Sequence, residues 1–151
     1  MFLRSPADIC IYGGAAGGGK TYALLLECLR HIDNKLFEAV IFRQSRPQIM
    51  SAGGLYATSQ EIYPHLGASS VLTPNVQWRF QSGAKVTFAH MFYEKEKYNW
   101  QGSQIPLLMF DELVHFTESQ FFYMFSRNRS TCGVRPYIRA TCNPDGESWV
   151  A

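Results

Sequence analysis

The glycine-rich segment GAAGGGKT, which runs from Gly14 to Thr21, constrains the fold of this chain more than any other feature. It matches the pattern G-x-x-x-x-G-K-[ST] at every constrained position. An apolar run over residues 9–12 precedes the segment, and a run of helix-forming residues over 22–31 follows it. A strand, a glycine loop and a helix in this order are typical of a phosphate-binding loop, and they predict an α/β fold.

The residue types in this segment suit a nucleotide. Glycines let the backbone fold around a phosphate chain with its N–H groups pointing inward, and the following helix adds the positive end of its dipole. We expect Lys20 to contact the β- and γ-phosphates and the Thr21 hydroxyl to hold Mg²⁺. The alternative is a glycine-rich turn that binds nothing, which a pattern this constrained disfavours. The predicted nucleotide-binding residues are Gly14, Ala15, Ala16, Gly17, Gly18, Gly19, Lys20 and Thr21.

Length and composition are those of one soluble globular domain. The chain has 151 residues, 46% hydrophobic and 17% charged, so it is long enough to bury a core. A net charge of +2 is too small to indicate nucleic-acid binding by itself. The four cysteines form no C-x-x-C pair, which favours reduced thiols in a cytosolic protein. No segment has the character of a signal peptide or a membrane span.

Strand-like and helix-like segments alternate along the chain. They are predicted at residues 39–42 (strand), 55–63 (helix), 105–110 (strand), 117–127 (helix) and 137–142 (strand). Two further segments of alternating polarity, 76–80 and 84–88, flank a short turn and predict a β-hairpin. We therefore predict one domain over residues 1–151. Its expected fold is a three-layer, mostly parallel P-loop NTPase sheet with an inserted β-hairpin, and its ligand lies at the C-terminal ends of the strands.

An acidic pair follows the most apolar of these strands. Asp111 and Glu112 come directly after residues 105–110, where the strand end would place Asp111 beside Mg²⁺. Glu112, one residue further, is then the predicted catalytic base that polarises a water in line with the γ-phosphate. An acidic pair without a role is the alternative reading. An extra strand between this pair and the glycine loop is the catalytic-glutamate (ASCE-type) topology, and it favours hydrolysis over binding alone.

The last predicted strand ends in small polar residues. In this topology it lies between the other two site strands, so its end points at the γ-phosphate. Thr141 or Asn143 would then hydrogen-bond the attacking water or sense the loss of the phosphate. A plain Asn-Pro turn is the alternative reading, and both can hold.

These motifs, in this order, resemble the ATPase part of a phage terminase large subunit, the motor that packages double-stranded DNA into a procapsid. The segments that carry the resemblance are GGAAGGGKT (13–21), IFR (41–43), WQGSQ (100–104), LMFDEL (108–113), SRNRS (126–130) and ATCNPDG (140–146) with Trp149. Together they cover most of the chain, and the later segments are more specific to the family than the glycine loop.

The resemblance implies a function and a set of partners. ATP and Mg²⁺ are the expected cofactors, with Asp111 holding the metal and Glu112 as the base. Asn143 is the expected residue that couples hydrolysis to DNA translocation. Expected partners are the backbone of double-stranded DNA without base specificity, the small terminase subunit, the portal protein and further copies in a ring, with no membrane. The expected location is the host cytoplasm.

Three departures from the family pattern bear on these expectations. No glutamine stands before the glycine loop to contact adenine, and Gln101 stands where many members have a trans-acting arginine. No acidic cluster corresponds to the family's nuclease, so the chain is expected to be a partial terminase with weak activity by itself. Another arginine must then supply positive charge to the transition state. The candidates are Arg43, Arg46, Arg127 and Arg129, of which Arg127 and Arg129 are preferred as catalytic residues.

Two other functions remain open. A helicase or recombination-type P-loop ATPase is one, although the residues after Asp111 depart from a helicase acidic box and a second lobe is lacking. A nucleotide-binding assembly module without turnover is the other, although Lys20, Thr21, Asp111 and Glu112 are all intact. Duplex unwinding would favour the first, and ATP binding without phosphate release would favour the second.

Overall fold

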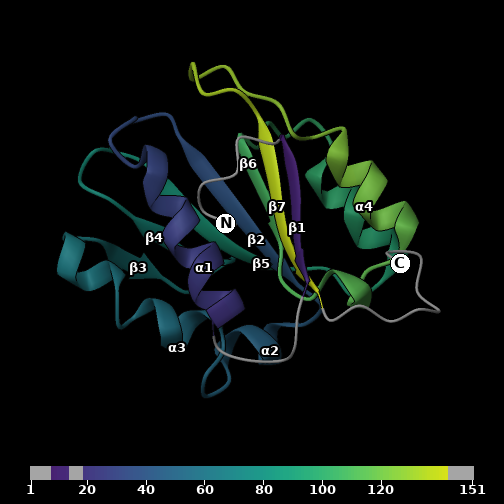
Figure 1. Cartoon of the computed structure of the whole chain (residues 1–151), viewed down its shortest axis with the longest axis horizontal. Helices are drawn as coiled ribbons and strands as arrows, with labels where there is room; N and C mark the ends of the chain where they lie inside the picture. The colour runs from purple at the N-terminus through teal and green to yellow at the C-terminus, as the bar shows by residue number, and fades with distance from the viewer. Residues whose placement is uncertain (1–7, 14–18, 143–151) are drawn as a thin grey trace.

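The computed structural model describes residues 8–13 and 19–142, which form one seven-stranded sheet with helices on both faces (Figure 1). The strands are β1 (Ile9–Gly13), β2 (Glu38–Arg43), β3 (Ser69–Val71), β4 (Val76–Arg79), β5 (Lys85–His90), β6 (Leu107–Phe110) and β7 (Tyr137–Cys142). The α-helices are α1 (Gly19–Glu27), α2 (Arg46–Met50), α3 (Leu55–Ser59) and α4 (Glu118–Phe125). Short 3-10 helices are η2 (Cys28–His31), η3 (Tyr63–Leu66), η4 (Glu94–Trp100) and η5 (Leu113–His115).

The strand order is β1-β7-β6-β2-β5-β4-β3. The first five strands in this order run parallel, and β4 and β3 are antiparallel to their neighbours. Parallel neighbours require crossover connections, so helices cover the sheet and its central strands are apolar on both faces. β7 lies between β1 and β6. The expected mostly parallel sheet, with one strand between the glycine-loop strand and the acidic strand, is confirmed.

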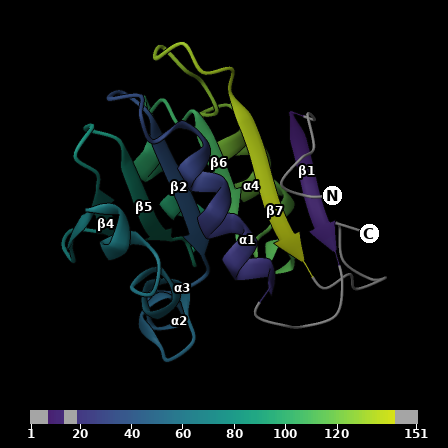
Figure 2. The same ribbon diagram turned by 60° about the vertical axis from the view of Figure 1, so that its left-hand side comes forward.

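Two hydrophobic cores lie on opposite faces of the sheet, and Figures 1 and 2 show α1 and α4 covering these two faces. Leu24 and Leu25 of α1 belong to one core, and Phe121 and Met124 of α4 belong to the other. All four residues of β6 are buried, and they alternate between the two cores. The acidic pair therefore follows a strand that packing holds on both sides.

The predicted β-hairpin is present, but it is part of the sheet. β4 and β5 pair antiparallel, and the N–H of Phe80 donates to the carbonyl of Ala84 at the turn. β5 also pairs in parallel with β2 along its whole length. Residues 84–88 alternate in polarity and are predicted as part of an inserted hairpin, yet both faces of β5 are buried. The hairpin thus extends the sheet beyond β2.

The helices agree only in part with the sequence prediction. Residues 46–50, which fall between the predicted segments, form α2, and the N–H of Ser45 before this helix donates to Oε1 of Gln48 at 3.1 Å. The helix expected over residues 55–63 ends earlier, at Ser59 of α3. α4 begins as expected at the capping box of Thr117 and Gln120. Its aromatic residues are divided: Phe121 is buried, whereas Phe122 and Phe125 are exposed.

Candidate active site

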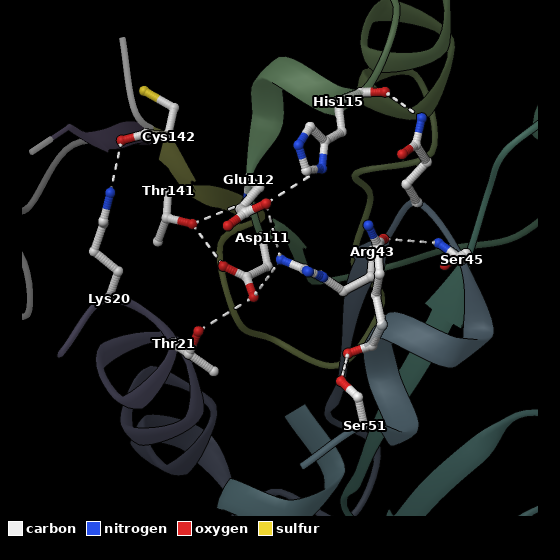
Figure 3. Close-up of polar contacts among 12 residues, drawn as sticks. Lys20, Thr21, Arg43, Ser45, Ser51, Asp111, Glu112, His115, Thr141 and Cys142 are labelled. Carbon is white, nitrogen blue, oxygen red and sulfur yellow. Dashed lines mark hydrogen bonds and ion pairs between the residues drawn. The ribbon is translucent and has the colours of Figure 1, made fainter. Parts of the chain in front are cut away.

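Polar side chains from four elements meet at the C-terminal edge of the parallel strands (Figure 3). Lys20 and Thr21 lie at the start of α1, and Arg43 ends β2. Asp111 and Glu112 follow β6, and Thr141 lies near the end of β7. Parallel strands place their carboxyl ends along one edge, so residues distant in sequence come together there.

Thr21 and Asp111 provide oxygen atoms that face one another. The Thr21 hydroxyl donates to Oδ2 of Asp111 at 3.3 Å, and Lys20 Nζ donates to the carbonyl of Cys142 at 3.1 Å. Hydroxyl and carboxylate oxygens are the ligand type that Mg²⁺ takes in nucleotide sites, together with phosphates and water. Within residues 8–13 and 19–142, no group of three or more His, Cys, Asp or Glu side chains is placed to hold a metal. The oxygens of Thr21 and Asp111 are of the type that completes a Mg²⁺ site together with a bound phosphate.

Asp111 is buried and held by three donors. Its side chain is about 5% exposed. Oδ1 accepts from the Thr141 hydroxyl at 2.7 Å, and Oδ2 accepts from Thr21 and from Nη1 of Arg43, both at 3.3 Å. A buried carboxylate requires such partners because water is excluded from it. This arrangement holds the Asp111 carboxylate toward the start of α1.

Glu112 points elsewhere because its backbone is left-handed. Its φ is +57°, which is unfavourable for a residue with a Cβ, and its N–H donates to the Thr141 hydroxyl at 3.0 Å. The side chain is 39% exposed and lies at the rim of the site, 3.3 Å from Nδ1 of His115. The backbone conformation thus separates the two acids: Asp111 lies in the interior and Glu112 faces the open side of the site.

Thr141 contacts the acidic pair directly. One hydroxyl accepts from the Glu112 backbone and donates to Asp111, so it fixes both residues of the pair. Sequence reasoning places Thr141 at the site but assigns it to the attacking water or the γ-phosphate. Its position near the carboxyl end of the neighbouring parallel strand is the signal for the contact that is observed.

The arginine candidates fall into two groups. Arg43 lies in the site, with Nη1 3.3 Å from Asp111 Oδ2 and 3.4 Å from Glu112 Oε2. Arg46 is held elsewhere, since it donates to the carbonyl of Leu72 at 2.9 Å.

Arg127 and Arg129 lie at the opposite edge of the sheet. The carbonyl of Arg127 accepts from the N–H of Ile105, which precedes β6. The Asn128 side chain between the two arginines donates to the carbonyl of Tyr137, the first residue of β7. These contacts are at the N-terminal ends of the strands, so neither arginine belongs to this chain's own site.

Sequence reasoning does not assign Arg43 or His115 to the acidic pair. The signal for Arg43 is its place on the strand next to β6, where the N–H of Asp111 donates to the carbonyl of Phe42. The signal for His115 is its separation of three residues from Glu112, with a 3-10 turn between them. The predicted roles of Gly14, Ala15, Ala16, Gly17, Gly18 and Asn143 fall on residues outside the described part of the chain.

Other expectations concern the rest of the molecule. The cysteines at positions 10, 28, 132 and 142 are free thiols, as expected of a chain without paired cysteines. In the described part of the chain, no helix is long and apolar enough to cross a membrane.

The strand order and the site together define a P-loop NTPase domain of the catalytic-glutamate type. A lysine and a threonine open the first helix, and the acidic pair follows a strand separated from β1 by β7. The family model described as "Terminase large subunit, T4likevirus-type, N-terminal" matches residues 11–151. The chain belongs to this family of terminase N-terminal domains.

Solved structures of terminases have the same fold. The large terminase of a thermophilic bacteriophage is 18% identical, with a TM-score of 0.67, over 92% of this chain and 34% of its own. The large terminase ATPase domain of Thermus phage P74-26 is 13% identical, with a TM-score of 0.62, over 97% of this chain and 63% of its own. The Phi-28 gp11 DNA packaging motor is 14% identical, with a TM-score of 0.54, over 93% of this chain and 48% of its own. This chain thus spans about a third of the length of the first of these proteins. No curated protein sequence matches it significantly.

Proposed function

We propose that this chain is the ATP-hydrolysing domain of a motor that packages double-stranded phage DNA. The convergence of Thr21, Asp111 and Glu112 at one strand edge is the observation that carries the proposal. A similar large terminase has been solved in complex with ATP-gamma-S, at 19% identity and a TM-score of 0.66 over 93% of this chain and 34% of its own. Family membership and this geometry support the same chemistry here.

Each residue of the site has a separate task in this mechanism. Lys20 and the N–H groups of the glycine loop, Gly14 to Gly19, would bind the β- and γ-phosphates, and Thr21 and Asp111 would hold Mg²⁺. The metal would neutralise charge on the phosphate oxygens. Glu112, at the open side of the site, would accept a proton from the attacking water. The Thr141 hydroxyl keeps Asp111 and Glu112 on their two sides of the site.

We propose that Arg127 and Arg129 supply positive charge to the active site of a neighbouring subunit, not to the site of their own chain. Both lie near the N-terminal ends of β6 and β7, away from this chain's acidic pair, which supports a role at the nucleotide of a second copy in a ring. Mixing Glu112→Gln with Arg127→Ala tests this: two variants that are inactive alone should recover part of the wild-type rate together. If Arg127→Ala and Arg129→Ala both retain full activity, this assignment is wrong.

The remaining partners follow from the family. We propose that the motor holds the phosphate backbone of double-stranded DNA, that it works with the small terminase subunit and the portal protein, and that it acts in the host cytoplasm. Asn143 would couple hydrolysis to translocation. In that case Asn143→Ala retains phosphate release but loses its stimulation by DNA.

Phosphate release from ATP and Mg²⁺, with and without duplex DNA, tests the central proposal. Glu112→Gln should abolish release while ATP binding survives, and Lys20→Ala should weaken binding. Glu61→Gln and Lys35→Ala are matched controls, because both positions are exposed and outside the site. Release by Glu112→Gln at the wild-type rate would overturn its role as base. Bound ATP without release by any variant, with or without DNA, would identify an assembly module instead.

A further inference from the structure

One guanidinium nitrogen contacts both members of the acidic pair. Nη1 of Arg43 is 3.3 Å from Oδ2 of Asp111 and 3.4 Å from Oε2 of Glu112 (Figure 3). The Arg43 side chain is only 15% exposed, so these contacts are weakly screened by solvent. Two adjacent carboxylates repel one another, and a shared cation offsets this repulsion.

The sheet determines which residue occupies this position. β2 is the parallel neighbour of β6, with Phe42 opposite Phe110. The next residue on each strand is then Arg43 and Asp111, and the N–H of Asp111 donates to the carbonyl of Phe42 at 2.9 Å. The contact between Arg43 and the acidic pair is therefore set by strand register rather than by a mobile loop.

Arg43 shares an oxygen with the proposed metal site. Oδ2 of Asp111 accepts from Arg43 and also from the Thr21 hydroxyl. A divalent cation held by Thr21 and Asp111 would face the guanidinium across one carboxylate oxygen, and like charges at that separation repel. Glu112 then remains as the carboxylate partner of Arg43. Among the described residues, Nε of Arg43 is buried without a hydrogen-bond partner, so its present position leaves one donor unsatisfied.

The Glu112 carboxylate has few other restraints. Within residues 8–13 and 19–142 it contacts Arg43 and His115, and the His115 side chain is 36% exposed. Of Arg43 and His115, Arg43 is the more buried, and it lies on β2, whereas His115 belongs to the short helix that follows Glu112. Its guanidinium therefore has the greater influence on where the carboxylate lies.

We infer that Arg43 is a positioning residue with two states, which balances both acids in the absence of metal and holds Glu112 alone once the metal binds Asp111. This inference rests on the proposed function for the role of Glu112. Arg43 does not touch the phosphate in this scheme. It holds the base in place and competes with the cation for Asp111.

Cation binding without nucleotide and steady-state kinetics test the inference together. The probe is Mn²⁺, whose free concentration is followed by electron paramagnetic resonance. Arg43→Gln should bind Mn²⁺ on the order of tenfold more tightly than wild type, because the competing charge is gone. The same variant should lose on the order of 10- to 100-fold in kcat with KM for ATP unchanged, because Glu112 is no longer held in place.

Two further variants make the result specific to Arg43. Arg43→Lys keeps the charge but has one ammonium in place of the planar fork, so its Mn²⁺ affinity should remain near wild type and its kcat should lie between those of wild type and Arg43→Gln. Arg79→Gln is the matched control, since Arg79 is exposed on β4 and contacts Gln77, away from the site. It should match wild type in both measurements.

The outcomes separate this inference from the proposed function. If wild type releases phosphate in a Glu112-dependent manner but Arg43→Gln matches it in kcat and Mn²⁺ affinity, the inference fails and the function stands. If wild type does not turn over, the function fails and the Mn²⁺ titration decides the competition at Asp111. If Arg43→Gln shows no cooperative thermal transition, Arg43→Lys decides: wild-type kcat overturns the inference, and reduced kcat with unchanged Mn²⁺ affinity supports it.

Discussion

Replacing Thr141 with valine removes one hydroxyl and leaves the shape of the side chain nearly unchanged. That hydroxyl accepts from the N–H of Glu112 at 3.0 Å and donates to Oδ1 of Asp111 at 2.7 Å. Thr141 is 1% exposed and Asp111 4% exposed, so water has little access to replace either bond. The variant therefore leaves a buried carboxylate oxygen and a backbone donor without these partners.

The size of the effect follows from these two losses. A hydrogen bond to a charged group contributes about 1.5–3 kcal/mol, and an unsatisfied buried donor costs about 1–3 kcal/mol. The added methyl group recovers about 0.8 kcal/mol through apolar burial. We expect the free energy of unfolding to fall by about 3 kcal/mol. We also expect ATP turnover to decrease, because the left-handed backbone of Glu112 loses a restraint.

Urea denaturation of wild type and of Thr141→Val measures the change in the free energy of unfolding. Thr87→Val is the matched control. Thr87 is 3% exposed and bonds Glu38 and Gln77, but these partners line a pocket of about 150 Å³ that water can enter. The control should therefore lose only about 1 kcal/mol. Equal losses in the two variants would refute the argument that burial of Asp111 and Thr141 makes the Thr141 hydroxyl so important.

Three further predictions concern backbone strain, pH and thiol reactivity. Glu112→Gly should be about 1 kcal/mol more stable than Glu112→Ala in urea, because a Cβ at φ +57° is unfavourable; equal stability would contradict the strain. Burial, and then the charge of Arg30, lower the pKa of His31, so the unfolded chain binds a proton that the folded chain disfavours. Stability should thus decrease as pH falls from about 7 toward 5, and His31→Gln should flatten that dependence in thermal melts at several pH values. Burial raises the pKa of the Cys28 thiol to about 12, so it should resist DTNB in the native protein and react on unfolding; labelling of native Cys28 would show that this core opens.

Local patterns were sufficient for most of the fold. Residues 137–142 and the helix that begins after Thr117 agree with expectation, because buried strands have apolar residues on both faces and capping boxes act within four residues. Hydrophobic spacing indicated neither the end of α3 at Ser59 nor the existence of the five-residue helix α2. The strand between β1 and β6 followed from the order of the motifs, because few topologies accommodate a glycine loop and a distant acidic strand.

The identity of the chemistry was readable in the sequence, since Lys20, Thr21, Asp111 and Glu112 occur in motifs whose spacing is set by local strand and helix geometry. The partners of those residues were not readable. Arg43 reaches the acidic pair only because β2 pairs with β6. Arg127 is excluded from this chain's site because it lies beside the N-terminal end of β6, whereas the acidic pair follows the C-terminal end. Strand register and strand direction depend on contacts between residues far apart in the chain. The tertiary structure therefore decided which arginine faces the acids, while the local sequence had already determined where the acids lie.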